Sequence, residues 1–183
     1  MKKMILYISG YNSTRKEWIL EDLTKYFPDE FINYYVLSGD YDTDITTISE
    51  IISNAKMPVY IIGHSTGGFW ALSMYRMFKD KVIGIHCINP ALDIIDAMRK
   101  INGTYLSSID RLYAEYSKNI DIAYKEKIPI CIYQSINDEI VDINFNKTYC
   151  LLCAGHLFDY TFGHRFDQTI FNELLKKIKE YIL

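Results

Sequence analysis

Six short apolar runs alternate with amphipathic stretches along the chain, and this alternation restricts the folds available to it. Each run is rich in branched and aromatic residues, as expected of strands that are covered on both faces. We expect strands at Met4–Ser9, Phe31–Leu37, Val59–Ile62, Val82–Ile88, Ile130–Ser135 and Leu157–Phe162. Strands separated by helices predict a three-layer α/β/α fold around a mostly parallel six-stranded sheet.

Helical patterns fill the intervals between these runs. We expect helices over Lys16–Phe27, Thr46–Ala55, residues 66–78, Ile143–Cys153 and Asp167–Ile182, and a mostly helical segment over Leu92–Tyr124. The expected strand order is 2-1-3-4-5-6, with right-handed crossovers. The direction of winding reverses between strands 1 and 3, and ligands bind at such a point, beyond the carboxyl ends of the strands. With 183 residues, the chain fits a single domain over residues 1–183 that lacks a sizeable cap.

The third strand leads directly into Gly63-His64-Ser65-Thr66-Gly67, a Gly-x-Ser-x-Gly motif that is followed by a helix. In this setting a serine occupies a tight strand-to-helix turn with its hydroxyl exposed at the tip. Gly63 and Gly67 are required because a side chain at either position would collide with the backbone where the chain reverses. The motif therefore predicts a serine hydrolase with Ser65 as its nucleophile.

A serine nucleophile needs a base, and a histidine base needs a carboxylate that orients it. In this class of fold the three residues follow one another as Ser, Asp or Glu, and His. Asp138 follows the fifth expected strand and His164 follows the sixth. Both would lie at the same sheet edge as Ser65, so we expect Asp138 to be the acid of the triad and His164 to be the base.

Other side chains are weaker candidates for these roles. Glu139 and Asp142 are alternatives for the carboxylate, and His156 is the main rival base, although it precedes the last strand at the opposite edge of the sheet. His64 adjoins the nucleophile, but we expect its ring to point away from the base position. His86 falls inside a strand, where a histidine is most often a hydrogen-bonded core residue.

An oxyanion hole needs two donors near Ser65, and backbone N–H groups are the expected source. The N–H of Thr66 at the start of the helix is one candidate, and that of Tyr11, after the first strand, is the other. We expect the pocket walls to come from the Asp40–Asp44 loop and from Leu92–Tyr124, which is also a candidate partial lid.

Composition excludes several other classes of protein. The net charge is −3, and no block of Lys and Arg suggests nucleic acid as a partner. No apolar stretch is long enough for a membrane span, and the run after Met1-Lys2-Lys3 is too short for a signal peptide. We therefore expect a cytoplasmic location, and the proposed chemistry needs no metal or organic cofactor.

The four cysteines lie in apolar stretches and are expected to be buried thiols; they are Cys87, Cys131, Cys150 and Cys153. Cys150-x-x-Cys153-x-x-His156 has the spacing of half a zinc site. Because a second cysteine pair is missing and His156 follows too closely, zinc is not the expected interpretation.

Several segments together resemble the YqiA-like esterase family of small, cap-less α/β-hydrolases. They are residues 6–13, 63–68, 88–91, 134–142 and 163–166. The resemblance implies Ser65 as nucleophile, Asp138 as acid, His164 as base, and esterase activity on short acyl esters. This chain has Ser9-Gly10-Tyr11 where the first loop of the family usually reads His-Gly-Phe. It also has His64 and Thr66 where relatives often carry Ser and Leu.

The leading hypothesis is a carboxylesterase or thioesterase acting on a small-molecule acyl ester or thioester. The altered first loop motivates an alternative, a non-catalytic binding module on a hydrolase fold. An acyltransferase or lyase that uses the same triad is a further alternative.

Overall fold

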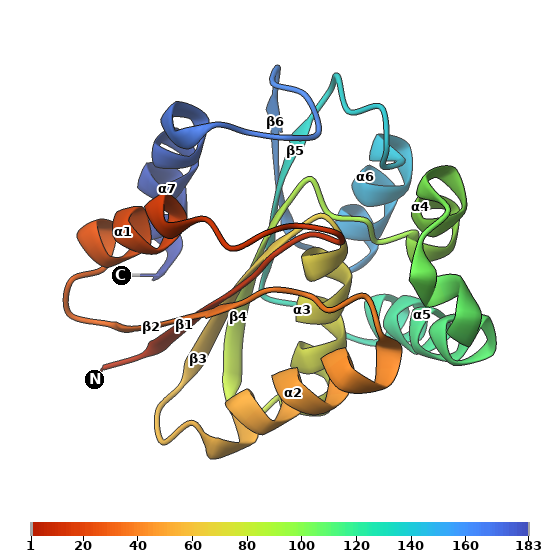
Figure 1. The fold of residues 1–183 in the computed structure, drawn as a ribbon, viewed down its shortest axis with the longest axis horizontal. Helices are drawn as coiled ribbons and strands as arrows, with labels where there is room; N and C mark the ends of the chain where they lie inside the picture. The colour runs from red at the N-terminus through yellow and green to blue at the C-terminus, as the bar shows by residue number, and fades with distance from the viewer. Residues whose placement is uncertain (1, 183) are drawn as a thin grey trace.

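A six-stranded sheet runs through the centre of the molecule in the computed structural model, which describes residues 2–182 (Figure 1). The strands are β1 (Met4–Ile8), β2 (Phe31–Tyr35), β3 (Val59–His64), β4 (Val82–Ile88), β5 (Ile130–Ser135) and β6 (His156–Tyr160). Their order is β2-β1-β3-β4-β5-β6, and every neighbouring pair is parallel. The predicted fold class and strand order are confirmed.

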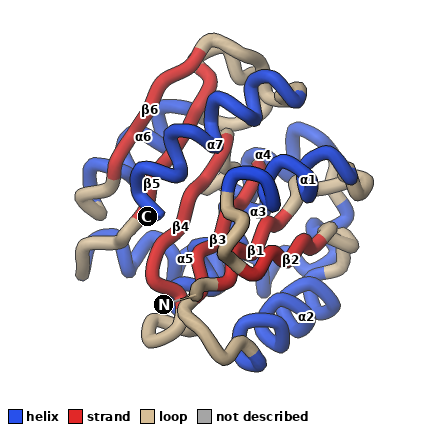
Figure 2. The backbone as a smooth tube through the Cα atoms, turned by 90° about the vertical axis from the view of Figure 1, so that its left-hand side faces the viewer, coloured by secondary structure: helices blue, strands red, loops and turns tan. Residues whose placement is uncertain are grey.

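Helices cover both faces of the sheet. Figures 1 and 2 show α1 and α7 together on one face, while the remaining helices lie on the other. The helices are α1 (Glu17–Tyr26), α2 (Tyr41–Asn54), α3 (Thr66–Met77), α4 (Ile94–Ile101), α5 (Ile109–Lys125), α6 (Ile143–Leu152) and α7 (Gln168–Ile182), with a short 3₁₀ helix, η1 (Thr104–Ser108). Within residues 2–182, no helix has both the length and the apolar character needed to cross a membrane.

The continuous apolar character of β1 follows from this layering. Leu6 and Ile8 belong to the core beneath α2–α6, whereas Ile5 and Tyr7 belong to the core beneath α1 and α7. Successive side chains of a strand point to opposite faces, so a strand that is covered on both faces buries every residue. The whole of β1 is accordingly buried.

One expectation about the helices needs correction. The second helix begins at Tyr41, not at Thr46, because the Asp40 carboxylate accepts a hydrogen bond from the Thr43 N–H at 2.9 Å and caps it there. The mostly helical character expected of Leu92–Tyr124 is confirmed, and Asn102 divides the interval by ending α4 in the left-handed conformation with φ 49°. Some strand ends also differ slightly from the expected ones. For example, β6 runs from His156 to Tyr160, whereas we expected Leu157–Phe162.

A buried carboxylate ties η1 to the body of the protein. Asp44 is fully buried and accepts hydrogen bonds from the Tyr35 hydroxyl at 2.6 Å and from the Ser38 N–H at 2.8 Å. The Tyr105 hydroxyl of η1 also donates to this carboxylate. Burial and the negative charge of Asp44 raise the pKa of Tyr105, so the hydroxyl keeps its proton. The residues between α4 and α5 are thus anchored to the start of α2.

We predict that Tyr105→Phe lowers the free energy of unfolding by about 1–3 kcal/mol, because it removes a donor from a buried charge. Tyr113→Phe is the matched control: Tyr113 is 40% exposed and accepts its hydrogen bond from Arg99 at the surface. Its effect should stay within about 0.5 kcal/mol. Urea denaturation measures both values, and equal losses would contradict the anchoring role.

Candidate active site

Ser65 joins β3 to α3 with φ 54° and ψ −120°. A positive φ is uncommon for residues other than glycine, and hydrogen bonds hold Ser65 in this conformation. Its N–H donates to the Ile88 carbonyl at 2.9 Å, and its own carbonyl accepts from the N–H groups of Gly68 at 2.9 Å and Ala91 at 3.0 Å. The turn is therefore fixed by the end of β4 as well as by its own helix.

The two motif glycines permit this turn by leaving room for backbone. A Cβ at Gly63 would lie 2.3 Å from the Gly67 carbonyl oxygen, and a Cβ at Gly67 would lie 2.3 Å from the Ile8 carbonyl oxygen. Both contacts are with main chain, which cannot swing aside as a side chain does. The collision expected from the sequence is thus explicit in the structure.

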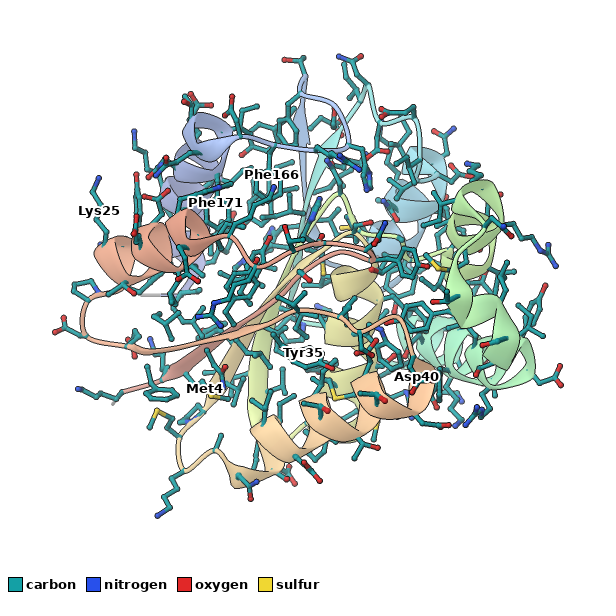
Figure 3. All side chains as sticks on the ribbon, viewed as in Figure 1. Met4, Lys25, Tyr35, Asp40, Phe166 and Phe171 are labelled. Atoms are coloured by element: carbon teal, nitrogen blue, oxygen red, sulfur yellow. The ribbon has the colours of Figure 1, made fainter. Side chains whose placement is uncertain are left out.

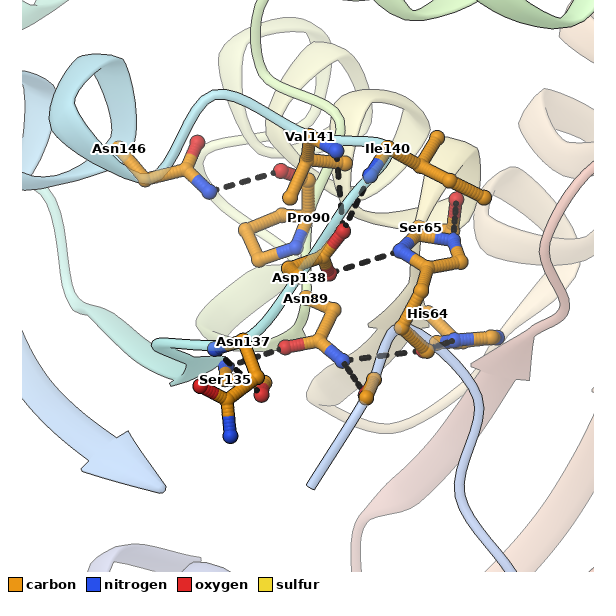
Figure 4. A network of polar contacts seen from close by, with 12 residues as sticks. His64, Ser65, Asn89, Pro90, Ser135, Asn137, Asp138, Ile140, Val141 and Asn146 are labelled. Carbon is orange, nitrogen blue, oxygen red and sulfur yellow. Dashed lines mark hydrogen bonds and ion pairs between the residues drawn. The ribbon is translucent and has the colours of Figure 1, made fainter. Parts of the chain in front are cut away.

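Ser65, His164 and Asp138 form one chain of hydrogen bonds. The Nε2 atom of His164 lies 3.0 Å from the Ser65 Oγ, and its Nδ1 atom lies 2.8 Å from Asp138 Oδ2. The loops after β3, β5 and β6 supply these side chains at one edge of the sheet, and Figure 4 shows the network from close by. The three residues expected to form a triad are brought together, in a geometry suited to proton transfer.

The Asp138 carboxylate is built into its loop. Its side chain is fully buried, and Oδ1 accepts the N–H groups of Ile140 at 2.8 Å and Val141 at 3.0 Å. Burial alone raises the pKa of Asp138, but the hydrogen bonds from His164 and the backbone outweigh it, and the net pKa falls below the usual value. An ionised Asp138 accepts the Nδ1–H of His164, which leaves Nε2 free to accept the Ser65 proton.

The rival candidates lie elsewhere or have other partners. Glu139 is exposed, and Asp142 caps α6 by accepting the Asn144 N–H at 2.9 Å. His156 begins β6 at the opposite sheet edge, where its ring packs 5.2 Å from that of Tyr181. His86 is buried, with Nδ1 3.1 Å from the Tyr133 hydroxyl. The prediction of a hydrogen-bonded core histidine at position 86 is confirmed.

His64 lies closer to the base than the sequence indicated. Its ring does not point away from His164: the two ring centroids are 5.6 Å apart, and the His64 Nε2 lies 3.3 Å from the His164 carbonyl oxygen. Burial, and after it the neighbouring His164, lower the pKa of His64 to about 3. His64 is therefore a neutral ring, positioned to donate Nε2–H to the main chain of His164.

Asn89 is a site residue for which sequence reasoning gave no role. Its fully buried amide donates to the carbonyl oxygens of Gly163 at 3.1 Å and His164 at 3.0 Å, and its Oδ1 accepts the Ser135 N–H at 2.6 Å. The residue adopts φ 42°, which asparagine tolerates better than most residues. One side chain thus links the ends of β4 and β5 to the histidine loop. In the sequence, only the Asn89-Pro90 pair at the end of a strand pointed to a special role for this position.

The segments that carry the candidate oxyanion donors touch one another. A Cβ placed on Gly10 would lie 3.1 Å from the Ser65 Cβ, so the loop after β1 runs against the nucleophile. The N–H groups of Tyr11 and Thr66 donate to no protein acceptor within residues 2–182. Their role in an oxyanion hole stays a prediction that this arrangement supports.

The altered first loop has its own internal support. The Ser9 hydroxyl accepts the Leu37 N–H at 3.2 Å, which joins the loop to the residues after β2. The Tyr11 hydroxyl accepts the Thr104 N–H at 3.0 Å, and the Thr104 hydroxyl donates to the Gly39 carbonyl at 2.6 Å. Ser9 and Tyr11 therefore fix a loop that lacks the family's usual histidine.

A cavity of about 320 Å³ opens beside Ser65 and His164. Its wall comes mainly from residues 9–14, Lys16 and residues 164–166, and Ile101 at the end of α4 and Ile140 add to it. We expected Leu92–Tyr124 to form part of the pocket wall, and among the described residues Ile101 is the one of this segment that lines the cavity. The expectation for Asp40–Asp44 is wrong: within the described chain these residues do not line the cavity, because they form the start of α2 and its buried carboxylate.

Comparisons with known proteins agree with this architecture. A family model described as "Uncharacterised protein family (UPF0227)" matches residues 4–182. Comparison with curated proteins gives no match.

Three solved structures illustrate the likeness in fold. The esterase domain of a Rhodothermus marinus protein gives a TM-score of 0.74 at 13% identity, covering 97% of this chain and 84% of that one. The monoacylglycerol lipase of Paleococcus ferrophilus gives 0.73 at 12% identity, covering 97% and 94%. Mouse alpha/beta hydrolase domain-containing protein 10 gives 0.71 at 15% identity, covering 98% and 89%. The chain therefore has an α/β-hydrolase fold.

We predict that Asn89→Ala releases the histidine loop. The change removes the Asn89 hydrogen bonds to two carbonyls and to the Ser135 N–H, and we expect a loss of about 2–4 kcal/mol in unfolding free energy. The low-field proton NMR signal of the His164 Nδ1–H should broaden or vanish through faster exchange with water. Asn144→Ala, at an exposed position on α6, should alter neither quantity. An unchanged Nδ1–H signal in Asn89→Ala would refute the positioning role.

Proposed function

The chain belongs to the UPF0227 family, and we propose that it is a serine hydrolase that cleaves small acyl esters or thioesters. The observation that carries this proposal is the hydrogen-bond chain from Asp138 through His164 to Ser65, beside an open cavity. The esterases and lipases that share its fold support the hydrolase class. The residue roles are those expected from the sequence.

Acylation begins when His164 Nε2 accepts the proton of the Ser65 hydroxyl as Oγ attacks the acyl carbon. The carbonyl oxygen becomes an oxyanion in the tetrahedral intermediate, while Asp138 stabilises the imidazolium. Collapse breaks the bond to the leaving group, which takes the proton from Nε2 and departs as an alcohol or thiol. An acyl ester on Ser65 remains.

Deacylation repeats these steps with water as the nucleophile. His164 Nε2 accepts a proton from the water as its oxygen attacks the acyl carbon, and then returns the proton to Ser65 Oγ. The acid product leaves, and the resting hydrogen bonds are restored. Backbone N–H groups of Tyr11 and Thr66 would stabilise both oxyanions, and such a donor is typically worth about 3 kcal/mol.

Fluorophosphonate labelling with intact-mass detection tests this proposal. Wild type should gain one adduct at Ser65, Ser65→Ala should gain none, and His164→Ala should react at least about 100-fold more slowly because the base is missing. Ser13→Ala is the matched control, because Ser13 lines the same cavity without a base beside it. A folded wild type that forms no adduct would contradict the proposal and favour a binding module.

The pH profile gives a second test. Because the pKa of His64 is lowered to about 3, this ring is neutral at all pH values above about 4 and has no proton to lose there. We predict that log kcat/KM for ester hydrolysis rises with a slope of one along its acid limb and then levels off. A slope approaching two would mean that both histidines must lose a proton, which contradicts this assignment.

A further inference from the structure

Charge is distributed unevenly around the cavity beside Ser65. Its wall contains two cationic side chains, Lys16 and Arg165, and no Asp or Glu among the described residues. The chain as a whole has the opposite bias, with 23 acidic and 20 basic residues. The nearest carboxylate in the hydrogen-bond network, Asp138, is fully buried behind His164. The cavity is therefore a local positive region on a negatively charged protein.

Lys16 and Arg165 are both exposed, and neither forms an ion pair within residues 2–182. The acidic residues beside them in sequence are engaged elsewhere. Glu17 pairs with Arg15 at 2.9 Å, and Asp167 accepts the Ile170 N–H at 2.9 Å at the start of α7. The two cations thus have no ion-pair partner in the described chain, and the Lys16 Nζ lies 5.6 Å from the centre of the Trp18 ring.

The two cations come from different loops that flank the nucleophile. Lys16 ends the β1–α1 connection, whose Gly10 lies against Ser65, and Arg165 directly follows the base in the β6–α7 connection. Tyr34 and Phe166, the latter labelled in Figure 3, add aromatic surface to the same wall. The wall therefore combines apolar surface for an organic group with two positive charges.

This inference rests on the proposed function: we propose that the natural substrate carries a carboxylate or phosphate group on the same molecule as its ester, bound by Lys16 and Arg165. Arg165 offers a planar fork of N–H donors that matches the oxygens of either anion, and Lys16 adds a compact charge. A cavity with one sign of charge also concentrates substrates of the opposite sign. Because His64 is neutral, the positive charge at this wall comes from Lys16 and Arg165.

Matched pairs of an anionic and a neutral ester test the proposal, and they distinguish a carboxylate substrate from a phosphate substrate. The first pair is the mono-4-nitrophenyl ester of glutaric acid and its neutral methyl ester. The second pair is 4-acetoxyphenyl phosphate and neutral 4-acetoxyanisole. After each rate is divided by that of alkaline hydrolysis, the anionic member of at least one pair should show a kcat/KM about tenfold higher. The first pair places the anion on the acyl group, and the second places it on the leaving group.

Charge-removing variants assign the preference to these residues. Lys16→Gln and Arg165→Gln should each lower the anionic-to-neutral ratio of kcat/KM at least about threefold. Lys25→Gln is the control, because it removes the same charge from the last turn of α1, at the end away from the cavity (Figure 3). The ratio rather than the absolute rate is compared, which corrects for any disturbance of His164 by its neighbour.

The outcomes separate this inference from the proposed function. Hydrolysis of the neutral esters without an anionic preference in either pair would overturn the anionic substrate and leave the serine hydrolase standing. A preference that survives both Lys16→Gln and Arg165→Gln would overturn the assignment to these residues. Failure of every ester to react, together with no fluorophosphonate adduct, would overturn both proposals.

Discussion

At Ser65 the backbone reverses from β3 into α3 in a conformation that costs of order 1–3 kcal/mol for a residue with a side chain. The reversal persists because α3 approaches β3 at Gly63 and β1 at Gly67 so closely that only glycine fits. Hydrogen bonds from Ser65 to the end of β4 and the residues after it offset the strain. The position of the hydroxyl is therefore set by the sheet, and the other site residues are arranged around a fixed point.

The base is held by its main chain as much as by its ring. Its carbonyl oxygen lies within hydrogen-bond distance of the Asn89 amide and the His64 ring, which stand at the ends of β4 and β3. Asn89 also accepts a hydrogen bond from the Ser135 N–H, at the end of the strand that leads to Asp138. The loops of the acid and the base are thus tied to one buried amide, and their separation does not depend on flexible surface chain.

Sequence reasoning predicted the fold and the three central residues because both follow from local patterns and general rules. Apolar runs locate strands, and the loop after a given strand supplies a given role. Asn89 and His64 could not be assigned in this way, because their partners lie 75 and 100 residues away in sequence. The start of α2 was misplaced although its cap is local, because Asp40 bonds the Thr43 N–H only three residues away. The role of Asp40–Asp44 in the cavity wall was mistaken because Asp44 bonds Tyr105, which belongs to a distant 3₁₀ helix.

In the proposed mechanism, Ser65 carries the acyl group during turnover. Rapid-quench mass spectrometry with 4-nitrophenyl butyrate tests it most directly, combined with release of 4-nitrophenol in the same mixing experiment. We predict a stoichiometric burst of 4-nitrophenol, with the butyryl mass on the peptide that contains Ser65. Steady hydrolysis that persists in purified Ser65→Ala, without acylation of that peptide in wild type, would contradict it.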